Sequence, residues 1–219
     1  MKLRAADLKH SLSQFASIAK REKKDAVRMV AKGFVKDIVA VTPPGSKDVE
    51  GKKAQKQGEA SIRLDLARIM VVPEKGALKG PGPESASSVH KAQRNPSDGR
   101  VYALRKGKRK PVDAAQLRAL EKLLFSRVGF LASGWNSMAI RLGVNLPAWV
   151  KRHGTKAGIV KVVETDTRFR IEGVNGTAYV GNVKDYLRRI DWTVGLQATK
   201  LENQCLAILK KAIKSSGFK

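Results

Sequence analysis

The sequence predicts an α+β fold: a long N-terminal helix, central helices and a C-terminal amphipathic helix pack on a small antiparallel β-meander, with a long extended arm. Three observations support this class. Apolar residues recur at three- and four-residue spacing in the first, central and last parts of the chain. Between residues 157 and 181 the spacing becomes two, as in strands. Proline and glycine interrupt both patterns over 43–112. We expect a single domain over 1–219.

Residues 3–41 predict one long helix. Its middle, KREKKDA at 20–26, is interpreted as a solvated face or a slight break. The helix is expected to end at Thr42-Pro43-Pro44-Gly45, because the residue before a proline disfavours the α region and proline lacks an amide hydrogen. One face carries the apolar residues Leu8, Leu12, Phe15, Ala19, Val27, Val30, Phe34 and Ile38.

Segment 43–112 holds seven of the eight prolines, with Gly-Pro-Gly-Pro at 80–83. A short helix is predicted at 58–70, where Ile62, Leu66 and Ile69 share a face. The rest is predicted to be an extended Pro/Gly-rich arm or long loop, inserted between the first and second long helices.

A second helix is predicted to begin at Asp113, with Gln116 three residues on as in a capping box. Its apolar pattern runs through Trp135. Gly129 and Gly134 interrupt it, which suggests that another backbone approaches closely there. Gly143 is the expected stop, and 147–154 reads as one further helical turn with Pro147 at its start.

Three short strands are predicted at 157–164, 168–174 and 177–181, the last two joined by Asn175-Gly176 in a hairpin turn. Asp191 is expected to open the final helix. Its apolar stripe comprises Val194, Ala198, Leu201, Cys205, Ile208 and Ala212, and Cys205 is therefore interpreted as a core residue.

Charge and cysteine content limit the function classes. The 44 Lys and Arg against 19 Asp and Glu give a net charge of +25, so the surface is expected to attract nucleic acid, anionic membranes or acidic proteins. The single cysteine excludes a disulfide framework and a cysteine zinc site. Because no apolar run has the length of a signal peptide or a membrane span, we expect a soluble protein in a reducing compartment.

No catalytic motif is present in the sequence: there is no phosphate-binding glycine loop, no H-E-x-x-H and no G-x-S-x-G. His10, His90 and His153 show no pattern of neighbouring carboxylates that would suggest a metal site or a general base. We therefore expect no enzymatic activity, no metal and no cofactor.

Two groups of residues are candidate contacts. The basic run at 105–110 is either a polyanion contact on a flexible tether or a solvated linker, and both interpretations stay open. Its candidate residues, with one preceding arginine, are Arg100, Arg105, Lys106, Lys108, Arg109 and Lys110. Trp135 and Trp149 fit a core role or an oligomer interface, where Trp149, Arg152 and His153 are the candidates.

Several motifs together resemble the head–tail joining and tail-completion proteins of tailed bacteriophages. They are Val41-Thr42-Pro43-Pro44-Gly45, RVGFLASGWN at 127–136, and Trp149 to Thr155, followed by a small sheet and an amphipathic helix. Gly45-Ser46 replaces the family's Thr-Gly, and His153 replaces an acidic residue.

The resemblance implies a non-enzymatic ring subunit of the virion neck, present in the host cytoplasm during assembly. Its implied partners are copies of itself, the connector, the tail tube or terminator and the packaged DNA, with no membrane. The 46–112 arm would contact a neighbouring protein. An alternative from the charge alone is a non-specific nucleic-acid-binding protein that uses the basic block 91–110. Association with an anionic membrane is a weaker alternative, because the helices lack a Trp- or Phe-rich apolar face.

Overall fold

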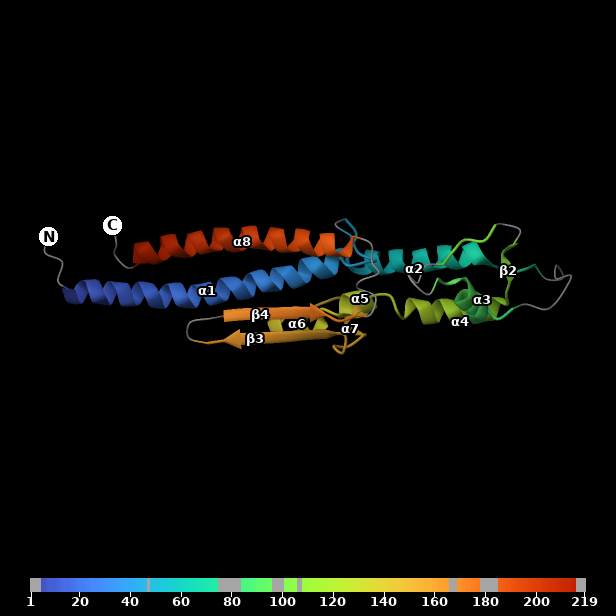
Figure 1. Cartoon of the computed structure of the whole chain (residues 1–219), viewed down its shortest axis with the longest axis horizontal. Coiled ribbons are helices and arrows are strands. Elements are labelled where there is room, and N and C mark those ends of the chain that lie inside the picture. Colours follow the sequence, from blue (N-terminus) through green and yellow to red (C-terminus); the bar gives the residue numbers. More distant parts are fainter. Residues whose placement is uncertain are drawn as a thin grey trace. The chain divides into compact units, whose positions relative to one another are not determined.

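The computed structural model describes residues 5–46, 48–74, 84–95, 101–105, 108–165, 169–177 and 185–215 (Figure 1). The fold is mostly helical with a small β content, which confirms the mixed α+β class. The chain divides into two compact units. Unit 1 comprises 1–39, 133–146 and 154–219, and unit 2 comprises 40–132 and 147–153. A single domain over the whole chain stays a prediction.

Helix α1 (Ala5–Val41) confirms the predicted N-terminal helix and continues without a break through its polar middle. It ends where the sequence turns to Thr42-Pro43-Pro44-Gly45. Phe34 on this helix packs edge-on against Trp135, with ring centroids 5.6 Å apart. The apolar face of α1 therefore contributes to the core of unit 1, as the periodicity predicted.

The sheet of unit 1 has two strands, β3 (Gly158–Glu164) and β4 (Phe169–Asn175), paired antiparallel from Gly158 opposite Asn175 to Glu164 opposite Phe169. Helix α6 (Asn136–Leu142) lies on β3, where Ser137 Oγ donates to the carbonyl of Gly158 at 2.8 Å. A Cβ added at Gly158 would lie 2.0 Å from the carbonyl oxygen of Gly134. This contact confirms the predicted close approach of another backbone at Gly134.

An Asx turn lies at Asn175, where the sequence predicted a hairpin turn. The Asn175 side-chain oxygen accepts from Thr177 N at 3.1 Å and from Thr177 Oγ1 at 2.9 Å, which is an Asx turn at the end of β4. Apart from Thr177, the predicted third strand at 177–181 lies outside the described residues. The three-stranded meander and its Asn175-Gly176 hairpin therefore stay predictions.

Helix α8 (Tyr186–Ser215) begins five residues before the predicted start at Asp191 and runs antiparallel to α1 (Figure 1). Side chains pair in opposite order along the two helices: Gln197 with Asp37 at 2.6 Å, Gln204 Nε2 with Met29 Sδ at 3.4 Å, and Lys211 with Glu22 at 2.5 Å.

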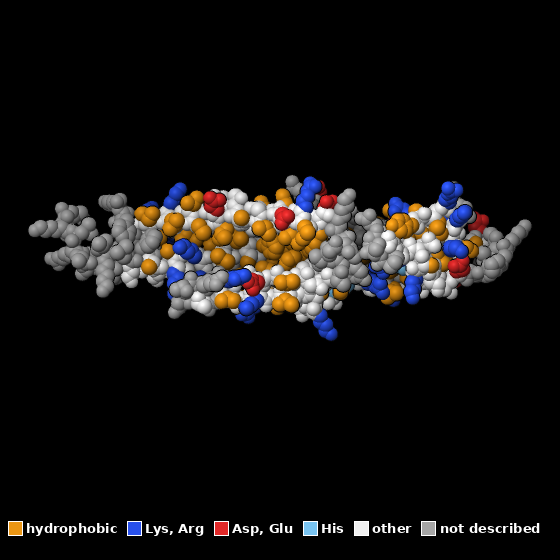
Figure 2. All heavy atoms as spheres, in the orientation of Figure 1, with side chains coloured by type: hydrophobic (Ala, Val, Ile, Leu, Met, Phe, Trp, Pro, Cys, Tyr) orange, Lys and Arg blue, Asp and Glu red, His pale blue; other side chains and the backbone are white. Residues whose placement is uncertain are grey.

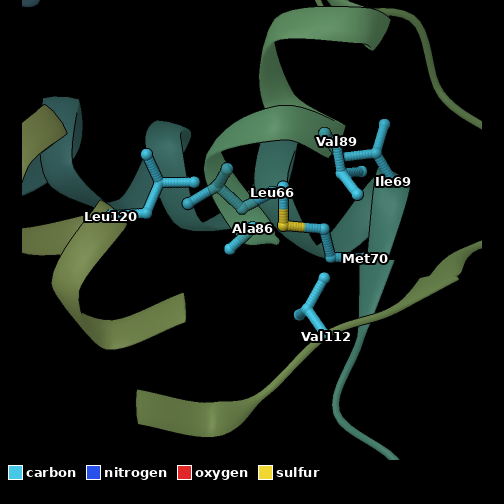
Figure 3. Packing of buried hydrophobic residues seen from close by; sticks show 7 residues of the cluster. All are labelled: Leu66, Ile69, Met70, Ala86, Val89, Val112 and Leu120. Atoms are coloured by element: carbon cyan, nitrogen blue, oxygen red, sulfur yellow. The ribbon is translucent and has the colours of Figure 1, made fainter. Parts of the chain in front are cut away.

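Unit 2 has three helices around one apolar cluster: α2 (Gly51–Ile69), α3 (Ala86–Gln93) and α4 (Ala114–Phe125). The short strands β1 (Met70–Val71) and β2 (Lys110–Pro111) pair in parallel beside them. The buried cluster, drawn in Figure 3, comprises Leu66, Ile69, Met70, Ala86, Val89, Val112 and Leu120.

This cluster corrects the prediction of an extended arm over 43–112. The described residues of that segment form two helices and two strands that bury apolar side chains against α4. The apolar residues are too widely spaced along the chain to give one periodic pattern, yet they converge in space. The prolines and glycines separate short elements instead of marking one extended segment. Residues 47, 75–83, 96–100 and 106–107 lie outside the description.

The predicted second long helix is also corrected, because it is divided into α4, α5 (Phe130–Ser133) and α6. Gly129 has a φ of +98°, and a Cβ there would lie 2.5 Å from the Trp149 ring. Both features require glycine and end the regular helix before it. Helix α7 (Ala148–Lys151) and the left-handed Gly143 confirm the predicted short turn and the predicted stop.

The predicted cap of α4 is half right. The Asp113 carboxylate accepts from the backbone amides of Ala115 and Gln116 at 2.7 and 3.0 Å, which confirms it as the N-cap. Gln116 does not complete a capping box. Its side-chain oxygen accepts from the backbone amide of Ala86 at 3.3 Å and so ties the start of α3 to α4.

Candidate interaction surfaces

The basic run at 105–110 is partly engaged within unit 2. Lys110 Nζ forms an ion pair with Glu84 at 2.9 Å, and Arg109 donates to the carbonyl of Ala67 near the end of α2 at 3.1 Å. Arg105 and Lys108 are exposed, while Arg100 and Lys106 lie outside the described residues. The structure thus brings two of the six candidate cations into contacts with their own unit.

The three interface candidates on and after α7 have local structural roles. Trp149 is buried and covers Gly129, which confirms the core interpretation and leaves little of its ring accessible to a partner. The Arg152 guanidinium donates to the carbonyls of Phe125 and Val128 at 2.7 and 2.8 Å, where α4 ends. A cation at this position satisfies carbonyls that the helix leaves unpaired.

His153 completes the same arrangement. Its Nε2 lies 2.9 Å from the carbonyl oxygen of Val128 and 3.4 Å from Arg152 Nε. One nitrogen cannot donate to the carbonyl and accept from the arginine at once. The shorter contact favours a proton on Nε2 that is donated to Val128, with the ring edge-on to Phe130.

A shallow surface depression of about 330 Å³ lies in unit 2 between α2, α4 and Arg152. Its charged lining is mixed in sign, with Glu59 and Glu121 beside Arg118 and Lys122. Arg63 lies 4.9 Å above the Phe125 ring and 3.9 Å from Glu121. The lining thus presents charges of both signs rather than a concentration of one sign.

The contact face of α8 coincides only in part with the predicted apolar stripe, of which Ile208 and Ala212 are buried. Thr193 and Gln197 are buried, whereas Val194 is 50% exposed and Cys205 is only half-buried. The core interpretation of Cys205 is therefore only partly right. Gln197 turns toward α1, where its amide donates to Asp37, and a polar contact thus joins the two helices near the C-terminal end of α1.

Large apolar side chains of α8 remain on the surface as a result. Leu187 is 72% exposed, and Figure 2 shows apolar side chains gathered along α8 and α1 on the face in view. The exposed large apolar residues of α8 are here called the α8 apolar surface: Leu187, Trp192, Val194, Leu196, Leu206, Leu209 and Ile213. A helix that is apolar around much of its circumference is typical of one that is covered on several sides.

Helix α1 carries a row of cations, of which the sequence analysis considered only those within the polar middle at 20–26. Lys20, Lys24, Arg28, Lys32 and Lys36 follow one another at intervals of four residues, and all except the half-buried Lys24 are exposed. Successive members are neighbours on the helix surface, but each step of four residues also turns by about 40°, so the five follow a line that winds about 160° around α1. We call it the α1 cation row.

The described residues hold no cluster of His, Cys, Asp and Glu that could bind a metal ion. His90 is half-buried in α3, and its pKa is lowered by burial and by the nearby cations Arg94 and Arg127, against a smaller effect of Asp65 that raises it. The side chain of His10 lies outside the description. Among the helices of the described segments, none is long and apolar enough to cross a membrane.

No family model, curated protein or solved structure matches the chain.

Proposed function

We propose that this protein is a structural subunit of the neck of a tailed-bacteriophage virion, a head–tail joining or tail-completion protein. In this proposal it assembles as a ring and meets the connector and the tail tube or terminator, without any catalytic role. The motifs around Pro43-Pro44-Gly45 and Trp149–Thr155 suggest the family, and the α8 apolar surface carries the argument for assembly.

That surface is long enough for an extended subunit contact. Leu187 and Ile213 are 26 residues apart, which corresponds to about 39 Å of helix at 1.5 Å per residue. Large exposed apolar patches on soluble proteins mark interaction sites. A neighbouring copy is the occupant that the proposal assigns to it. Ring contacts join two different surfaces, so α8 need not pack against another α8.

The net charge shapes how copies associate. Chains of +25 repel one another, and salt screens this repulsion beyond about 8 Å at physiological ionic strength. Contact through an apolar surface should therefore strengthen as salt increases. Docking onto an acidic virion protein should instead weaken with salt, since opposite charges attract. The two kinds of contact can thus be separated experimentally.

The alternative function, nucleic-acid binding through the 91–110 block, has less support from the described residues. Arg109 and Lys110 are the last two cations of that block, and both contact their own unit. A flexible tether that binds phosphates with all of its cations would direct those side chains to the solvent, whereas Arg109 and Lys110 are directed to their own unit.

The test compares an α8 variant with a matched variant elsewhere. Leu187→Gln, Val194→Gln and Leu206→Gln together remove apolar contacts from α8, and Leu64→Gln with Leu123→Gln change residues of similar exposure in unit 2. Light scattering after size exclusion, at low and high salt, is expected to show oligomers for the wild type and the unit 2 variant but monomers for the α8 variant. Electron microscopy should show rings. A wild-type chain that stays monomeric at every salt and protein concentration would contradict the ring.

A further inference from the structure

The outward side of α8 carries residues that follow one another in alternating steps of four and three. We call them the α8 seam, and all of them are exposed: Arg188, Trp192, Gly195, Thr199, Glu202, Leu206, Leu209 and Ile213. At about 100° per residue, they lie on the side of α8 opposite the buried Thr193, Gln197 and Ile208. Such alternation is the heptad pattern of a helix that packs on another helix. Its drift of about 20° per heptad on a straight helix is absorbed by supercoiling.

Two residues of the seam are typical of a contact with a partner. A Cβ added at Gly195 would have no atom within 4 Å, although glycine within a helix lowers its stability relative to alanine. Trp192 is 47% exposed, whereas Trp135 and Trp149 are each 5% exposed. A partner helix that approaches closely at Gly195 and covers the Trp192 ring accounts for both features.

The seam is complementary to itself in antiparallel order. A two-fold axis midway between positions 200 and 201 brings every member opposite another member of the seam in a second copy. Four distinct pairs result, each occurring twice: Leu206 with Gly195, Leu209 with Trp192, Ile213 with Arg188, and Glu202 with Thr199. Large side chains thus meet the open space at glycine or another apolar side chain. The Thr199 hydroxyl donates to the carbonyl of Gly195 at 3.2 Å, so it keeps its own acceptor in the contact.

We propose that free copies of this protein pair through the α8 seam as an antiparallel two-fold dimer. A two-fold contact uses the same surface on both copies and closes on two. The inference goes beyond the proposed ring and does not depend on it. The dimer covers α8 in the free protein, and a ring contact through α8 would replace it.

The area of the seam indicates a weak dimer. From Arg188 to Ile213 it extends over about 38 Å of a helix about 10 Å wide, so each copy contributes about 380 Å². A standard stable interface takes about 800 Å² from each partner. The pair is therefore reversible and suits a form that precedes assembly. At each end Arg188 of one copy approaches Lys214 of the other, so salt should strengthen the dimer.

Glu202 opposes the pairing at its centre. One carboxylate from each copy lies close to the two-fold axis, and like charges repel. A single polar residue within a helix seam specifies register at a cost in stability. Removing this charge by Glu202→Gln should therefore tighten the dimer.

Sedimentation equilibrium of the full chain measures the dimer dissociation constant. The seam variant carries Trp192→Gln and Leu206→Gln. The control variant carries Leu187→Gln and Val194→Gln, which change apolar residues of α8 that are 72% and 50% exposed but lie outside the seam. We expect the seam variant to weaken the dimer at least about tenfold, because each change acts twice in a two-fold contact. The control variant should leave the dissociation constant nearly unchanged.

A second pair of variants fills the space at Gly195. Gly195→Leu improves helix propensity but occupies the place of the partner's leucine, so it should weaken the dimer while circular dichroism shows no loss of helix. Ala207→Leu, at an exposed position of α8 outside the seam, is the matched control and should have little effect.

Distances between nitroxide labels give the orientation. With Cys205→Ser and Lys214→Cys, antiparallel pairing separates the two labelled positions by about 40 Å along the helices, whereas parallel pairing brings them side by side. A short distance, equal losses in the seam and control variants, no tightening by Glu202→Gln, or a wild-type chain that forms no dimer would overturn the proposal. Rings without a free dimer would overturn the pair and leave the neck function standing. A dimer that never forms rings would support the pair and contradict the neck function.

Discussion

Replacing Tyr186 by phenylalanine tests the buried polar contact that links three elements of unit 1. Tyr186 begins α8, and its hydroxyl accepts from Trp135 Nε1 at 3.0 Å and from Asn175 Nδ2 at 3.3 Å. Trp135 precedes α6, and Asn175 ends β4. Tyr186 and Trp135 are 1% and 5% exposed, so water cannot readily replace the lost partner.

The expected cost follows from this burial. The substitution keeps the ring but leaves the indole N–H of Trp135 without its acceptor. A buried donor that loses its partner costs about 1–3 kcal/mol. The loss of a hydrogen bond at an exposed site costs far less, because water takes the place of the lost partner. For a chain of 150–250 residues, each kcal/mol lowers Tm by about 2–4 °C. We therefore expect Tyr186→Phe to lower the melting temperature of unit 1 by several degrees.

Urea unfolding followed by circular dichroism measures this cost, and a second tyrosine provides the control. The hydroxyl of Tyr102 accepts from Asn95 Nδ2 at the same 3.0 Å, but Tyr102 is 59% exposed. Tyr102→Phe should change the free energy of unfolding by less than about 0.5 kcal/mol. A double-mutant cycle with Trp135→Phe should give a coupling of at least about 0.5 kcal/mol. Equal effects of the two tyrosine substitutions would refute the reasoning.

Two further predictions concern unit 2. Asp113→Ala removes two hydrogen bonds that cap α4 and should lower the free energy of unfolding by about 0.5–2 kcal/mol, measured by thermal unfolding. Asp113→Asn should have a much smaller effect, because asparagine also caps helices. Equal losses of stability in the two variants would contradict the capping role. His90 has a pKa lowered by burial, Arg94 and Arg127, so below its ordinary value of 6.5 the unfolded chain binds more protons than the folded one. Its contribution is fully present above pH 6.5 and decreases as pH falls toward the lower folded pKa. His90→Gln should make stability less pH-dependent between pH 5 and 7, and an unchanged or steeper dependence would argue against it.

Local signals in the sequence predicted the elements that depend on local chemistry. The ends of α1 at Pro43 and of α6 at Gly143, the cap at Asp113 and the pairing strands β3 and β4 are examples. The small core of unit 2 could not be predicted in this way. It joins Leu66 to Val112 and Leu120, and no periodic pattern spans residues so far apart in the chain.

The candidate surfaces show the same limit. The sequence of α8 has apolar residues on more than one side, and periodicity alone cannot choose which side faces α1. The predicted stripe includes Val194, which is exposed, while the neighbouring Thr193 and Gln197 are buried. The choice depends on Asp37, which accepts a hydrogen bond from Gln197 across the helix pair. A residue about 160 positions away thus decides which apolar side chains remain on the surface.

This polar contact also fixes the register of the two helices. A Cβ at Gly33 would lie 2.7 Å from the Gln197 side-chain oxygen, so glycine is what lets the amide reach past the helix to Asp37. Sliding α8 by one turn would move the buried amide away from Asp37 and leave it unpaired, at a cost of about 1–3 kcal/mol. Single buried polar residues specify register in paired helices in this way. Here the selected register pairs Asp37 with Gln197 and Glu22 with Lys211 on the side of α1 that faces α8.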